Sequence, residues 1–128
     1  MTTLGRYAAM YNACMLVANL GFTRWRDVAK YDASLFSKDG QISVLLWGLA
    51  YLAAQENSPI FLVFAIEKAF YVVRWIQWMS RNDGMKEIKK ALRSKDKLKI
   101  LAPLFHSTYG TGDFLFGVLF LFKWLGVI

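Results

Sequence analysis

The 128-residue sequence contains one cysteine, one histidine and two prolines. The single cysteine, Cys14, excludes an intrachain disulfide, and we expect it to be a small buried apolar side chain. The single histidine, His106, excludes a haem held by two histidines of one chain and disfavours a histidine-rich metal site. The residues therefore indicate no metal site, and they name no cofactor.

Sequence motifs with a defined chemistry are also missing. The chain has no GxxxxGK[ST], HExxH or GxSxG motif, and Gly110-Thr111-Gly112 is too short to cradle a phosphate group. No set of residues is complete for nucleophilic, acid–base or metal-assisted catalysis. We assign no catalytic residue, and an enzyme is the less favoured class.

Basic residues are plentiful but are concentrated in two segments of the chain. The net charge is +7, and most of the sixteen lysines and arginines lie in the segments Arg24–Lys38 and Arg81–Lys99. Both segments flank apolar runs, which is typical of the positive-inside pattern of membrane proteins. A nucleic-acid interface would instead gather these charges on one face of a folded domain. We therefore expect no nucleic-acid partner.

Hydrophobic residues make up 56% of the chain, against roughly 45–50% in a typical soluble domain. They cluster into runs separated by charged connections. The pattern predicts an all-α integral membrane protein, with a four-transmembrane-helix bundle in a single domain, 1–128. The predicted spans are residues 5–22, 41–55, 59–79 and 113–128. The first has no small-x-small cleavage site after it, so we expect a retained helix, not a signal peptide.

Two features of the spans remain open in the sequence. Residues 41–55 reach only about 22 Å as a helix, less than the ~30 Å hydrocarbon core, so the sequence does not decide whether they span fully. Pro103 and the stretch Tyr109-Gly110-Thr111-Gly112 interrupt the last apolar segment, and we expect an irregular or partly buried entry over residues 101–111. Ser58 and Pro59 suit the N-cap and first helical position of the third span.

The connection between the third and fourth spans is basic. Met85, Ile88 and Leu92 recur at helical spacing, and lysines fill the opposite face. This pattern predicts a basic amphipathic helix, or a merely charged loop. The positive-inside rule places both basic connections on the cytoplasmic, matrix or stromal side and both termini on the opposite side. The predicted location is a bacterial inner membrane or an organelle membrane.

Polar side chains inside the predicted spans fall into two layers. Counting about 1.5 Å per helical residue from the outer face gives two depths. The shallower layer holds Asn12, Glu67, Lys68 and Lys123, and the deeper layer holds Asn19, Arg74 and Asp113. A charge in hydrocarbon costs roughly 2.5–3.5 kcal/mol on insertion scales, so we expect each one to have a partner.

We expect ion pairs between helices in both layers. Arg74 is predicted to pair with Asp113, and Glu67 with Lys123 or Lys68. Such pairs serve either to hold the bundle together or to bind a ligand or proton. Glu67 is the strongest functional candidate, because a desolvated carboxylate takes a raised pKa.

His106 and Tyr109 precede the last span. A histidine there could relay protons to Asp113, although a solvated or capping histidine is the commoner case.

Three classes of function are compatible with the sequence. The favoured class is an accessory, structural or oligomeric interaction subunit, partnered by membrane lipids and by other membrane-protein subunits or itself. The second is a small proton-coupled transporter centred on Glu67, Arg74 and Asp113. The third is a lipid- or isoprenoid-binding membrane enzyme, for which the aromatic residues of the third and fourth spans would line the pocket.

Overall fold

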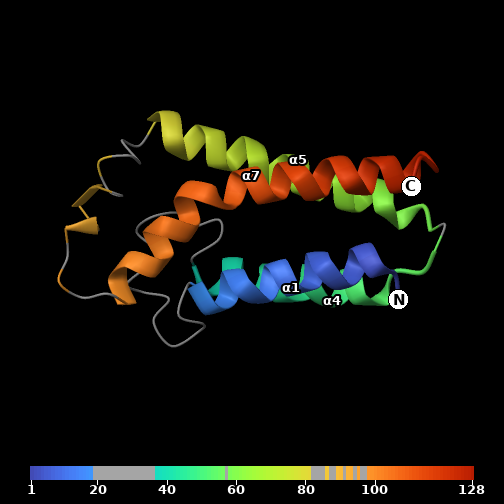
Figure 1. Cartoon of the computed structure of the whole chain (residues 1–128), viewed down its shortest axis with the longest axis horizontal. Helices are drawn as coiled ribbons and strands as arrows, with labels where there is room; N and C mark the ends of the chain where they lie inside the picture. Colours follow the sequence, from blue (N-terminus) through green and yellow to red (C-terminus); the bar gives the residue numbers. More distant parts are fainter. Residues whose placement is uncertain are drawn as a thin grey trace.

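The computed structural model describes residues 1–18, 37–56, 58–81, 86, 89–90, 92–93, 95 and 98–128, with the side chains of all these except 18, 81 and 98–107. The described chain is all-helical, with four helices: α1 (Thr3–Ala18), α4 (Lys38–Ala53), α5 (Ile60–Arg81) and α7 (Leu98–Trp124). Helix α1 packs along α4, and α5 packs along α7. A smaller contact between α1 and α7 joins the two pairs, and both termini lie at the same end of the molecule (Figure 1).

The starts of α4 and α5 are capped by serines. The Ser37 hydroxyl accepts a hydrogen bond from the Gly40 backbone N–H at 3.0 Å, and Asp39 adds a negative charge in the first turn. Ser58 accepts from the Ile60 N–H at 3.3 Å, directly before α5. The Ser37 cap explains why α4 begins at Lys38, three residues before the predicted start.

Helix α7 differs most from the prediction. It runs unbroken from Leu98 to Trp124, so an irregular entry over residues 101–111 is wrong, whereas the alternative of a partly buried entry agrees with the buried Tyr109 and Gly110. Pro103 lies near the start of the helix, where it removes a single backbone hydrogen bond. Gly110 and Gly112 are kept inside the helix by packing, because a Cβ atom at either position would overlap the Trp75 or Tyr11 ring. Residues 19–22 of the first predicted span and most of the basic connection lie outside the described residues.

The membrane interpretation is wrong: among the described residues, every helix is too short or too polar to cross a bilayer. Helices α1 and α4 have 16 residues each, about 24 Å at 1.5 Å per residue, against a hydrocarbon core of ~30 Å. Helix α5 carries Glu67, Lys68 and Arg74, and the polar segment His106–Asp113 occupies the middle of α7. This finding overturns the predicted integral membrane location, the four transmembrane spans and the assignment of basic loops and termini to opposite sides.

The core consists of two apolar clusters stacked along the helices. One is formed by Met15, Val44, Tyr71 and Tyr109. The other, nearer the termini, is formed by Ala8, Tyr51, Ala54, Phe61, Phe64 and Phe120. A set of buried polar side chains lies among these residues, and it forms the candidate site.

Candidate functional site: a buried ionisable cluster

Lys68 of α5 is the centre of the polar cluster. Its ammonium group donates to Asp113 Oδ1 of α7 at 2.9 Å, and both side chains are 1% exposed. It also contacts the Asn12 amide oxygen of α1 at 3.4 Å. Asn12 in turn donates through Nδ2 to the Val44 carbonyl oxygen of α4 at 2.9 Å. One chain of hydrogen bonds therefore connects all four helices.

Glu67, the neighbour of Lys68, faces α4. The Tyr51 hydroxyl donates to Glu67 Oε2 at 2.5 Å, and Glu67 Oε1 lies 3.9 Å from Lys68 Nζ. The Lys68 ammonium also lies over two aromatic rings, 5.2 Å from the centroid of Tyr51 and 5.3 Å from that of Tyr11. These cation–π contacts add attraction on the sides that the carboxylates leave open.

Close helix packing holds Lys68 in this position. Gly117 of α7 lies against it: a Cβ atom at Gly117 would be 3.2 Å from Lys68 Cβ. The absence of a side chain lets α7 approach α5 closely, as is usual where a backbone must come near a neighbour. On the other side, the Tyr11 hydroxyl donates to the Tyr109 carbonyl oxygen at 2.7 Å, which fixes one of the two rings.

The cluster holds two carboxylates and one ammonium group, so its formal charge is −1 when all three are ionised. Burial raises the pKa of Glu67 from 4.5 to about 7, although the Lys68 charge and the Tyr51 hydrogen bond oppose that increase. Burial also raises the pKa of Asp113, again against the effect of Lys68. The raised pKa of Glu67 therefore favours proton uptake by this carboxyl group near neutral pH, and a proton there would balance the charge of the cluster.

The two tyrosines of the cluster remain hydrogen-bond donors. Burial and the Glu67 carboxylate raise the pKa of Tyr51, and burial and Asp113 raise that of Tyr11. Both phenols consequently stay protonated across the physiological range.

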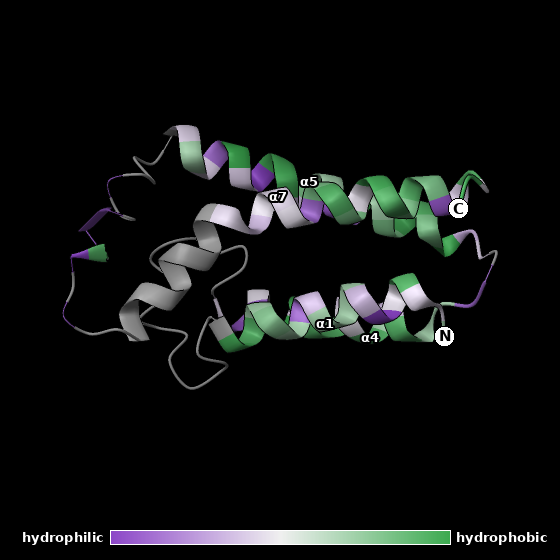
Figure 2. Ribbon diagram, in the orientation of Figure 1, coloured by the Kyte–Doolittle hydropathy of each residue, from purple (hydrophilic) through white to green (hydrophobic). Residues whose placement is uncertain are grey.

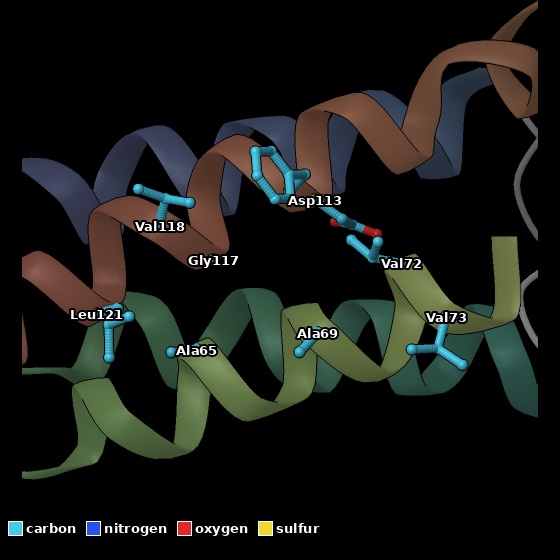
Figure 3. A pocket seen from close by; sticks show the side chains of 9 residues that line it. Ala65, Ala69, Val72, Val73, Asp113, Gly117, Val118 and Leu121 are labelled. Carbon is cyan, nitrogen blue, oxygen red and sulfur yellow. The ribbon is translucent and has the colours of Figure 1, made fainter. Parts of the chain in front are cut away.

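Two cavities adjoin Asp113. A cavity of about 10 Å³ lies among Asn12, Glu67, Lys68 and Asp113, with room for about one water molecule. A larger pocket of about 320 Å³ opens on the surface between α5 and α7, with apolar walls and Asp113 at its inner end (Figure 3). Asp113 Oδ2 is buried and accepts no hydrogen bond from the described residues.

No family model, curated protein or solved structure matches this chain. Among the residues that the structure describes, no group of three or more His, Cys, Asp or Glu side chains could hold a metal ion. The cluster is suited to binding a proton or a hydrogen-bonding group beside a fixed positive charge.

The structure brings together only part of the predicted set. Glu67, Lys68, Asp113 and Asn12 meet in the cluster, and Tyr109 contributes its carbonyl oxygen. The predicted Arg74–Asp113 pair is wrong: Asp113 binds Lys68, whereas Arg74 is exposed and donates to Gln77 at 3.5 Å. Of the two partners predicted for Glu67, Lys68 is the one in contact.

The remaining predicted residues lie away from the cluster or cannot be placed. Lys123 pairs with Glu56 at 2.5 Å, on a partly exposed surface near the end of α7. Asn19 and the His106 side chain lie outside the described residues. Cys14 is exposed, so the expected buried position is wrong.

Sequence reasoning missed the two tyrosines of the cluster. Tyr51 shares the buried face of α4 with Val44 and Gly48, at spacings of four and three residues. A tyrosine on an apolar helix face requires a hydrogen-bond partner for its hydroxyl group. This requirement could have indicated from the sequence that the Tyr51 hydroxyl bonds to a buried polar group such as Glu67.

Proposed function

We propose that this chain is an interaction subunit that assembles with a second copy of itself through the outer face of α4. The observation that carries the proposal is that α4 has two apolar faces and the fold covers only one. The inner face packs inside the molecule through Gln41, Val44, Gly48 and Tyr51. The outer face is an aliphatic stripe formed by Ile42, Leu45, Leu46, Leu49 and Leu52, each between 39% and 58% exposed.

Helices that are apolar all round are normally buried on all sides. Within the aliphatic stripe, Ile42, Leu45, Leu49 and Leu52 repeat at three- and four-residue steps, the spacing of a coiled-coil seam. No charged residue occurs between Asp39 and Glu56. Nothing in the stripe would repel an identical stripe, and an uncharged seam of this spacing packs against its own copy in a two-fold dimer.

The order of side chains favours an antiparallel pair. With Trp47 at the centre, Ile42 of one copy would face Leu52 of the other, and Leu45 would face Leu49. The same register brings the exposed Lys38, at the start of the helix, near the exposed Glu56 beyond its end, whose carboxylate also pairs with Lys123. Antiparallel packing also places the positive end of each helix dipole next to the negative end of its partner.

Sedimentation equilibrium of the purified chain tests this proposal. We expect a dimer at micromolar concentration, and we expect the Leu45→Lys/Leu49→Lys variant to be monomeric because it puts charges into the seam. Ile66→Lys is the matched control, since Ile66 is 61% exposed on α5, and it should remain a dimer. A monomeric wild type, or a dimer that persists in the double variant, would overturn the proposal.

A further inference from the structure

The pocket between α5 and α7 has a chemistry that the assembly surface on α4 does not use. Its walls are small or aliphatic side chains, including Ala65, Ala69, Val72, Val118 and Leu121. At one end, the carboxyl group of Asp113 lies beside Val72 (Figure 3). Figure 2 shows that the helices on either side are mainly hydrophobic along this stretch. The pocket is thus an open, mainly apolar pocket with one carboxyl group, that of Asp113, among its lining side chains.

Only one of the two carboxylate oxygens of Asp113 has a hydrogen-bond partner among the described residues. Oδ1 accepts from Lys68, whereas Oδ2 is buried without a hydrogen bond from the described residues. Leaving a buried carboxylate oxygen without a donor costs roughly 1–3 kcal/mol or more, so a donor at that position is favoured. The cluster also carries one more negative than positive charge when Glu67 and Asp113 are both ionised.

We propose that this pocket binds a primary alkylamine, with its hydrocarbon chain between α5 and α7 and its ammonium group donating to Asp113 Oδ2. The ammonium group supplies the missing donor, and its positive charge takes the place of the proton that Glu67 would otherwise hold near neutral pH. The pocket volume of about 320 Å³ has room for a short hydrocarbon chain. Because Asp113 Oδ2 is buried, the proposal requires the Val72 side chain, which lies beside the carboxyl group, to rotate away from it.

Three ligands with the same eight-carbon chain separate the contribution of the positive charge to binding from that of the hydrogen-bond donor. Octylamine has a charge and N–H donors, 1-octanol has a donor without a charge, and octyltrimethylammonium has a charge without a donor. In isothermal titration calorimetry with the full chain, we expect octylamine to bind one site per chain, at least tenfold more tightly than either analogue. Equal affinity for octylamine and one of the analogues would overturn the proposal.

Two substitutions locate the site. Ala69→Phe fills the pocket from its exposed rim and should abolish the binding of octylamine. Ala13→Phe, at an exposed alanine of α1, is the matched control and should bind as the wild type does. Asp113→Asn should remove the preference for octylamine over 1-octanol. If Asp113→Asn does not fold, Ala69→Phe and the ligand series decide alone, and octylamine binding that survives Ala69→Phe contradicts the proposal.

Discussion

At the scale of single residues, the dominant feature is that Lys68 is buried between two carboxylates. A charge removed from water is tolerated only when close partners replace its hydration. Here Asp113, Asn12 and two tyrosine rings do so from three other helices. The stability of the whole bundle therefore depends on this side chain more than on any exposed charge.

Replacing Lys68 by methionine should destabilise the protein strongly. Lys68→Met keeps most of the volume but leaves the carboxylates of Glu67 and Asp113 buried without a positive charge. Breaking a buried ion pair in this way costs about 3–5 kcal/mol. The free energy of unfolding at pH 7, measured by urea denaturation, should fall by that amount.

Lys123→Met is the matched control for that experiment. Lys123 pairs with Glu56, whose side chain is 59% exposed, and such a surface pair contributes at most about 1 kcal/mol. Equal losses in the two variants would mean that the burial of Lys68 contributes no special stability.

Glu67 should make stability depend on pH between 4.5 and 7. Its pKa is raised in the folded state to about 7, so the folded protein binds more protons than the unfolded chain in this window. Its stabilising contribution is complete below pH 4.5 and is lost as the pH rises through 7. The loss is about 3 kcal/mol at 1.36 kcal/mol per pKa unit, and Asp113 adds to it with the same sign.

Urea denaturation between pH 4 and 8 measures this dependence. Glu67→Gln should flatten the profile, because a neutral amide can still accept the Tyr51 hydrogen bond. Glu56→Gln, at an exposed carboxylate, should leave the profile as in the wild type. A wild-type stability that rises from pH 4.5 to 7 would refute the assigned role of Glu67.

At the scale of helices, close approach is achieved by glycines placed against aromatic rings. Gly110 of α7 is buried, and a Cβ atom there would overlap the Trp75 indole of α5. Gly112 faces the Tyr11 ring of α1 in the same way. Both glycines look like helix breakers in the sequence, but in the structure they allow α7 to contact two neighbours.

Gly110→Ala should consequently destabilise the protein, although alanine favours helix by about 1 kcal/mol. Overpacking against an indole ring costs typically 1–3 kcal/mol, and we expect a net loss. Thr111→Ala, at the exposed neighbouring position, serves as the control and should be neutral or slightly stabilising. An increase in the melting temperature of Gly110→Ala would show that Trp75 moves aside without cost.

The helices were predictable to within a few residues where apolar runs had clear ends. The sequence also identified Glu67, Lys68, Asp113 and Asn12 as interior polar residues. The predicted pairing of Arg74 with Asp113 was wrong, because counting depth along the sequence placed Asp113 at the start of a helix. Helix α7 begins at Leu98, so Asp113 lies in its middle, opposite Lys68. Which residues of two helices lie opposite each other depends on how the helices pack, and a single sequence does not specify that packing.

The prediction of membrane spans failed for a related reason. Overall hydrophobicity measures how many apolar residues a chain has, whereas spanning requires an uninterrupted apolar helix of about 20 residues. The charges of α5 and the length of α4 violate that requirement among the described helices. The apolar residues instead form two internal clusters and an outer surface that includes the stripe on α4.

At the scale of the whole molecule, buried charges hold a small helical bundle together, and we propose that its α4 surface mediates self-association. The interior network uses the inner face of α4 through Tyr51 and the Val44 carbonyl group. The outer face of the same helix would then form the two-fold contact. In the proposed dimer, α4 would link the stability of the fold to assembly, and we expect damage to the cluster to weaken the dimer as well.

A distance between two copies of Lys38 tests the central claim, the antiparallel pairing of α4, most directly. Lys38→Cys in a Cys14→Ser background carries one nitroxide label per chain, and pulsed electron spin resonance measures the label separation. With Trp47 at the centre, the two positions are eighteen residues apart along the seam, or about 27 Å at 1.5 Å per residue. The antiparallel dimer predicts a distribution near that value, whereas a separation near ~10 Å, as in a parallel pair, or no dipolar signal would contradict it.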